Sequence, residues 1–133
     1  MKFLRYAFLI MLCAALMLSL SACGDDDDGS YSVYVYNPGG NFVTNINESN
    51  FLLRSDVIFR LTDQKAAETF AADNDIIRDA VIKVLRELTE EEARNGNAEF
   101  LDAVAQRIVD SANEAMNTDV FYSASFNDFV VTR

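Results

Sequence analysis

The chain contains no histidine and no tryptophan, and it has only one proline, five glycines and two cysteines in 133 residues. Without histidine it can form neither a Ser-His-Asp or Cys-His nucleophile system nor a histidine-ligated zinc site. These absences argue against an enzyme. We expect no catalytic residues, no metal site and no cofactor.

The N-terminus joins positive charge to a long apolar run that ends at a cysteine. Lys2 and Arg5 precede residues 6–20, whose only polar member is Ser19. The run closes on Leu20-Ser21-Ala22-Cys23, which resembles the lipobox of bacterial lipoproteins, where an aliphatic and two small residues precede a lipidated cysteine. We predict a lipoprotein signal peptide over residues 1–22 and a lipid attachment site at Cys23, with acyl chains such as palmitate.

Two other interpretations of this segment remain open. Residues 3–22 are long enough for a transmembrane helix, since about 20 apolar residues cross a bilayer. A secretory signal without a lipid is the other, because the small residues near position 22 approach an A-x-A cleavage site. In all three cases the positive charges precede the apolar run, which places the rest of the chain on the periplasmic side of the inner membrane.

Removal of residues 1–22 leaves 111 residues, enough for one domain. Residues 23–30 include four consecutive aspartates, Asp25 to Asp28, whose mutual repulsion is typical of an extended tether. An EF-hand loop with its glycine at Gly29 would require a carboxylate where Val35 stands, so this is not a calcium loop. We predict a single domain over residues 31–133.

The mature chain is strongly acidic and lacks disulfides. Loss of Lys2 and Arg5 reduces 11 basic residues to 9, against 21 acidic ones, for a net charge of −12. Such a surface repels phosphate backbones and anionic headgroups, so we exclude nucleic acid as a partner and assign membrane contact to the lipid. Cys13 would leave with the signal and Cys23 would be acylated, so the domain must be stable by core packing alone.

The first half of the domain favours β-strands. Strands are predicted at residues 31–36, 42–46 and 51–61, separated by turns at 37–40 and 47–50. In the third strand the odd positions are apolar except for Ser55, which predicts a sheet with one covered and one wet face. The C-terminus alternates again over 120–126 and 129–131, with a change of phase at Asn127-Asp128 that predicts a bulge or turn.

Helices are predicted between these strands, over residues 63–72, after Asp73-Asn74-Asp75, in a short turn at 89–92, and over 98–116. The acidic pair Asp73 and Asp75 could suggest a glycosidase, but helix capping accounts for both residues. Each of the two longer helices has an apolar stripe, which we interpret as core in preference to a groove for a partner helix. The stripe of the helix after residue 75 comprises Ile76, Ile77, Ala80, Val81, Val84, Leu85 and Leu88. The stripe of the helix over 98–116 comprises Phe100, Leu101, Val104, Ala105, Ile108, Val109, Ala112 and Met116. The fold class is α+β, with a small, mainly antiparallel sheet packed on two amphipathic helices and the last strand paired back into the sheet.

Three stretches, taken together in their order along the chain, resemble the FliL family of flagellar basal-body-associated proteins. The strongest is residues 77–85, Ile-Arg-Asp-Ala-Val-Ile-Lys-Val-Leu, followed by the acidic segment Thr89-Glu90-Glu91-Glu92. Residues 42–46 with 51–56 are similar to two strands of the family, and residues 126–131 are similar to its closing strand. Typical family members are anchored by a transmembrane helix, so a lipid at Cys23 would be a departure.

The resemblance implies a non-enzymatic periplasmic domain with a fold like that of stomatin and prohibitin domains. It also implies a homo-oligomer that acts as a scaffold around stator or basal-body proteins and supports motility. The alternative is a lipoprotein binding module of the bacterial envelope with no flagellar role. A hydrolase that uses carboxylates alone is the least favoured interpretation.

Overall fold

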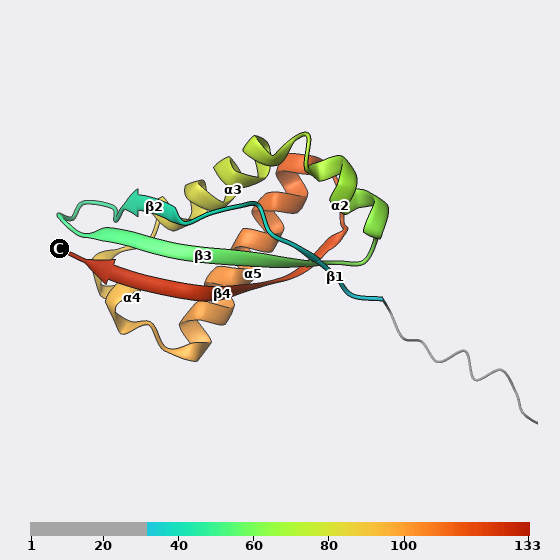
Figure 1. The fold of residues 1–133 in the computed structure, drawn as a ribbon. Helices are drawn as coiled ribbons and strands as arrows, with labels where there is room; N and C mark the ends of the chain where they lie inside the picture. Colours follow the sequence, from blue (N-terminus) through green and yellow to red (C-terminus); the bar gives the residue numbers. More distant parts are fainter. Residues whose placement is uncertain (1–31) are drawn as a thin grey trace, which may run out of the picture. The chain divides into compact units, whose positions relative to one another are not determined.

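The computed structural model describes residues 32–133, and its elements follow the predicted order of strands, helices and a final strand (Figure 1). The α+β class is confirmed. The predicted signal peptide, Cys23 and the acidic tether lie outside the described residues. The elements are β1 (Tyr34–Tyr36), β2 (Phe42–Asn45), β3 (Leu52–Leu61), α2 (Gln64–Phe70), α3 (Asn74–Arg86), α4 (Glu90–Asn95), α5 (Ala98–Met116) and β4 (Phe121–Thr132).

β3 is the central strand of a four-stranded antiparallel sheet. β4 pairs with the whole of β3, from Leu52 opposite Thr132 to Leu61 opposite Phe121. β1 pairs with the C-terminal end of β3 and β2 with its N-terminal end, so these two short strands share the other edge. The C-terminal strand therefore returns to the sheet as predicted, and it forms one long border of it.

Two register shifts in the β3–β4 pair make β4 longer than its partner. Asp56 lies opposite Asp128 whereas Val57 lies opposite Phe126, which leaves Asn127 as an extra residue. A second shift, at Arg60 and Leu61, leaves Tyr122 extra. The change of phase at Asn127-Asp128 is therefore a β-bulge within one continuous strand, one of the two forms predicted.

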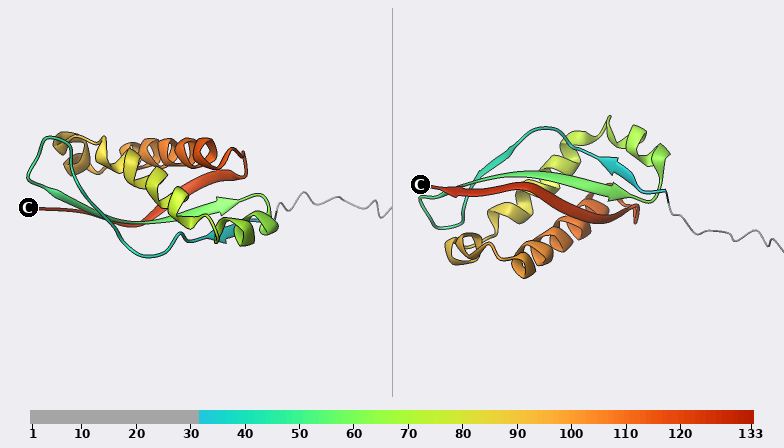
Figure 2. Two further views of the ribbon diagram at one scale, coloured as in Figure 1. Left: turned by 90° about the horizontal axis from the view of Figure 1, so that it is seen from above. Right: turned by 60° about the horizontal axis from the view of Figure 1, so that its bottom comes forward.

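The helices α3 and α5 pack on one face of the sheet (Figure 2). From α3 the core receives Ile77, Val81, Val84 and Leu85, and from α5 Val104, Ile108, Val109 and Ala112. One predicted core residue is wrong: Ile76 is 46% exposed. It lies in the first turn of α3, next to Ile77, and the stripe that faces the sheet is too narrow to include both.

Polar side chains define the helix ends. Asn97 accepts a hydrogen bond from the Phe100 amide at the start of α5, and Asn117 ends that helix in the left-handed conformation. Thr89 and Glu92 form a capping box at the start of α4. Asp73 occupies the N-cap position of α3 but makes no side-chain cap hydrogen bond, and Asp75 lies in the first turn, where the helix dipole favours negative charge.

Aromatic side chains gather in two places along β4. The closed aromatic cluster comprises Tyr36, Phe59, Phe70 and Phe121, all at most 7% exposed, with the rings of Phe70 and Phe121 stacked at 4.8 Å. The open aromatic cluster comprises Phe100, Phe126 and Phe129, all only half-buried. In it Phe129 contacts the other two rings edge to face, with centroids 5.2 Å and 6.2 Å apart.

Candidate functional site

The two acidic residues considered from the sequence lie together at the start of α3. Asp73 and Asp75 occupy the N-cap and first turn of α3, which are structural positions. Within residues 32–133, no three His, Cys, Asp or Glu side chains lie close enough together to hold a metal ion. The features with potential to bind something are instead two surface hollows and one sheet edge.

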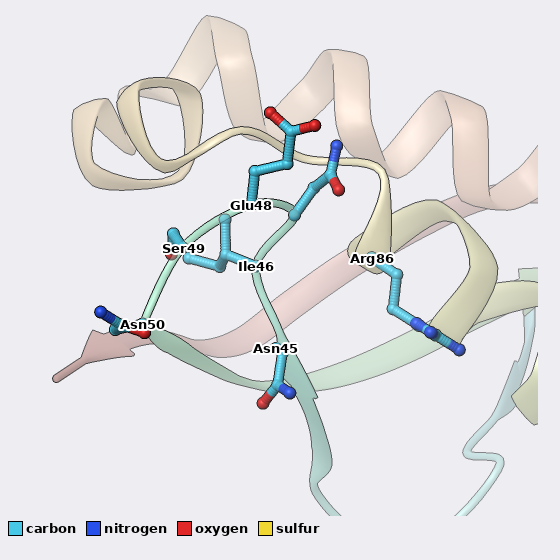
Figure 3. Close-up of a pocket in the computed structure, with 7 residues that line it drawn as sticks. Asn45, Ile46, Glu48, Ser49, Asn50 and Arg86 are labelled. Carbon is cyan, nitrogen blue, oxygen red and sulfur yellow. The ribbon is translucent and has the colours of Figure 1, made fainter.

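The first hollow lies at the turn between β2 and β3 (Figure 3). It has a volume of about 430 Å³ and is lined by Asn45, Ile46, Asn47, Glu48, Ser49, Asn50 and Arg86. Four of these seven residues form the turn that the sequence predicted at 47–50, and Asn45 and Ile46 belong to the strand predicted before it. Arg86 comes from the last turn of α3, so the hollow exists only because the helix packs beside the turn.

Backbone hydrogen bonds fix the shape of this turn. The Ile46 amide donates to the Phe51 carbonyl at 3.1 Å, and the Asn47 amide donates to the Leu88 carbonyl beyond α3 at 3.3 Å. The side chain of Ile46 is buried. The backbone of Glu48 has a φ of +53°, which is uncommon for a residue other than glycine. The turn therefore presents amide groups, the Ser49 hydroxyl and one carboxylate, and Arg86 adds a guanidinium. These groups suit hydrogen bonding to a partner.

A second hollow of about 490 Å³ lies between α3 and α5 on the side away from the sheet. Its lining combines the exposed Ile76 with Ala80 and Ala115 and with the charged Asp79, Lys83 and Glu114. The Ser111 hydroxyl donates to the Ala80 carbonyl at 3.2 Å across the two helices. This bond joins the two helices beside the hollow.

The loop between β1 and β2 is fastened to α3 by what we term the loop clamp: Tyr36, Asn74 and Arg78. The Tyr36 hydroxyl donates to Asn74 Oδ1 at 2.5 Å, and Asn74 Nδ2 donates to the Pro38 carbonyl at 2.7 Å. Arg78 donates to the carbonyls of Pro38 and Gly39, and its guanidinium lies over the Phe42 ring. Burial raises the pKa of the Tyr36 hydroxyl, so it stays protonated and remains a donor.

The third feature is the outer edge of β4. Among the described residues β4 pairs only with β3, and its opposite edge has no strand beside it. The open aromatic cluster lies along this edge, with Phe126 and Phe129 on the strand and Phe100 on α5. Polar contacts on the outer face are few: Arg54 pairs with Asp128 at 3.1 Å, and the Asn127 amide donates to Asp56.

The described residues thus define a small α+β domain with two surface hollows and one unpaired sheet edge. Comparison with known families identifies which domain it is. The model of the family described as flagellar basal body-associated protein FliL matches residues 35–131. The chain belongs to the FliL family. A search of curated proteins returned no match.

The matched range begins in β1 and ends one residue before the end of β4, so it takes in every helix and strand of the described domain. It includes all three stretches on which the sequence resemblance was based, and the predicted family is confirmed. Over residues 32–133, none of the helices has the length and apolar character needed to cross a membrane.

Proposed function

We propose that this chain is a non-enzymatic scaffold of the bacterial flagellar basal body, which supports the motor and its stator as an oligomer held at the membrane. The observation that carries the proposal is the family match over residues 35–131. The absence of histidine and the hydrogen-bonding character of the surface hollows are consistent with it. Contact with basal-body partners would be made by the folded domain itself.

We further propose that a lipid on Cys23 anchors the chain, with the domain in the periplasm. The support is the sequence Leu20-Ser21-Ala22-Cys23 after a basic and apolar segment. The two cysteines provide a matched pair of variants, since Cys13 lies inside the apolar run and Cys23 at its end. Cys23→Ser should abolish acylation and cleavage, whereas Cys13→Ser should change neither.

The anchor is tested by mass spectrometry of the mature N-terminus together with membrane fractionation. The expected result is an N-terminal acylated Cys23 in the unchanged protein and in Cys13→Ser. An uncleaved and unacylated N-terminus in the unchanged protein, with normal membrane retention, would contradict the lipid and favour the transmembrane helix.

The flagellar role is tested by an in-frame deletion of residues 24–133. We expect impaired swimming or swarming, most of all under viscous load, with filaments still assembled. The deletion is complemented with the unchanged gene and, as a matched control, with Cys13→Ser, both of which should restore motility. Normal motility of the deletion strain under viscous load would contradict the proposal and favour an envelope binding module without a flagellar role.

A further inference from the structure

The hydrophobic core is incomplete along β4. The side chains of β3 that face the helices, Leu53, Val57 and Phe59, are fully buried. Their partners across the strand pair, Val131, Phe126 and Ala124, are only half-buried. β4 is packed under α5, and no strand lies on its outer side in the described domain. Another strand placed there would extend the sheet and cover these side chains.

The bulge at Asn127 makes β4 complementary to a second copy of itself. Before the bulge the inward side chains are at even positions, Ala124 and Phe126, and after it at odd positions, Phe129 and Val131. Two copies paired antiparallel about a two-fold axis between Asn127 and Asp128 would place Phe126 opposite Phe129 of the second copy. In that register each side chain on the helix-covered face of one copy pairs with a side chain on the same face of the other copy, on both sides of the axis. In a strand without the bulge, side chains alternate strictly between the two faces of the sheet. An axis between two residues would then place a side chain of the helix-covered face opposite one of the other face.

Charge favours the same register. Asp128 is the only charged residue in β4, and Arg54 already pairs with it. The axis between residues 127 and 128 places each Asp128 opposite an asparagine of the other copy, not opposite another aspartate. The exposed side of α5, by contrast, carries Glu99, Asp102, Asp110 and Glu114. Two such acidic domains repel each other where these helix faces meet, whereas β4 carries a single charge that Arg54 pairs.

We propose that β4 is a self-association edge, through which two copies of the chain pair antiparallel into one continuous sheet and close the open aromatic cluster. Backbone hydrogen bonds along the edge would supply affinity, and the aromatic rings would supply specificity. The inference deepens the oligomeric part of the proposed function and names the surface that begins the assembly. Its test does not depend on motility.

Disulfide trapping in the full-length chain, in native membranes, tests this register. Ser125 and Val130 lie on the outer face, five residues and therefore about 17 Å apart along one strand. Cysteines at these positions are too far apart to bridge within a chain, because a disulfide needs Cα atoms within about 7 Å. In the proposed dimer, position 125 of one copy lies directly opposite position 130 of the other.

Under mild oxidation, S125C/V130C should therefore run at twice the chain mass, whereas S125C alone and V130C alone should not. The control pair D102C/E114C has a similar separation, about 18 Å along the exposed side of α5, and should remain monomeric. The unchanged chain measures any background from Cys13 and Cys23. Equal cross-linking of a single variant or of the control pair, or an adduct with a protein of another mass, would overturn the proposal.

A charge-swap experiment provides a second, independent measurement. In S125D/V130D, the aspartate at position 125 of each copy would lie opposite the aspartate at position 130 of the other copy. The detergent-solubilised protein should therefore become monomeric, as measured by light scattering. S125K/V130D restores opposite charges at both places and should remain dimeric, with an unchanged melting temperature. Identical sizes for the unchanged protein and both variants would refute self-association at β4. If the deletion strain swims normally while the disulfide forms, the flagellar proposal fails and this inference stands.

Discussion

The two aromatic clusters lie along the same strand, yet only one of them is sealed. The closed aromatic cluster draws its rings from β1, β3, α2 and β4, so protein surrounds it on every side. The open aromatic cluster lies between α5 and β4, and among the described residues no strand pairs with the outer edge of β4. The comparison shows that burial in this domain depends on how many elements converge on a ring and not on the kind of residue. We therefore expect the closed cluster to determine stability and the open cluster to determine assembly.

The largest expected effect separates the two clusters directly. Phe121→Ala should lower the free energy of unfolding by about 3–5 kcal/mol, because it empties a fully buried site. Phe129→Ala should cost less than half as much, since its side chain is only partly buried. Urea unfolding of the detergent-solubilised chain, followed by circular dichroism, measures both. Equal losses would show that the two clusters contribute alike to stability.

The next effect concerns the hydroxyl at the border of the closed cluster. Tyr36→Phe should cost about 1–2 kcal/mol, because it leaves Asn74 Oδ1, the nearer acceptor of the Tyr36 hydroxyl at 2.5 Å, without its donor. The pKa of Tyr36 is raised from 10.0 by burial, so its contribution is complete below pH 10 and is lost as pH rises through the higher folded-state pKa. Melting temperatures across alkaline pH should therefore fall more steeply for the unchanged chain than for Tyr36→Phe.

A smaller effect on stability is expected at the capping box that begins α4. Thr89→Ala should cost about 1 kcal/mol. Hydrogen bonds from the backbone and side chain of Thr89 lower the pKa of Glu92 below 4.5, so the stabilisation is complete above that pH and is lost as pH falls through the folded-state pKa. Glu92→Gln should remove this part of the acid dependence, as acid titration of the unfolding midpoint can show. An unchanged acid profile in Glu92→Gln would contradict the assignment.

The smallest effect is expected at Ser55, which lies opposite Phe42 on one side and Phe129 on the other. Its side chain is fully buried, and its hydroxyl has no hydrogen-bond partner among the described residues. Ser55→Ala removes an unsatisfied polar group, so the melting temperature should stay the same or rise slightly. A clear loss of stability in thermal unfolding would mean that this hydroxyl has a partner in the assembled protein.

The strands and helices were predictable because each leaves a local pattern. The apolar spacing predicted α5 at its observed bounds, and the change of phase at Asn127 predicted an interruption in β4. The error at Ile76 has a physical reason: spacing gives the direction of an apolar stripe, but the width depends on the neighbouring helix and sheet. That the edge of β4 is open was not predictable, because alternation shows which face of a strand is buried and not which strand lies beside it.

The surface sites were still less accessible to sequence reasoning. The turn over residues 47–50 was predicted, but Arg86 joins it only through tertiary packing. The partners in the loop clamp are 36 to 40 residues apart, and no local signal connects Pro38 with Asn74 or Arg78. The family resemblance, by contrast, was visible in the sequence because it rests on the order of whole segments.

The loop clamp also has a mechanical consequence. A pull on the chain from the side of Ser32 first reaches β1, which has only three residue pairs with β3 and would peel away easily on its own. The last residue of β1 is Tyr36, whose ring lies in the closed cluster and whose hydroxyl is tied to α3 through Asn74. Tension would thus be shared between β3, which pairs with β1, and the helix layer. The sheet could keep its shape, and its edge, while the domain bears a pull from its N-terminal side.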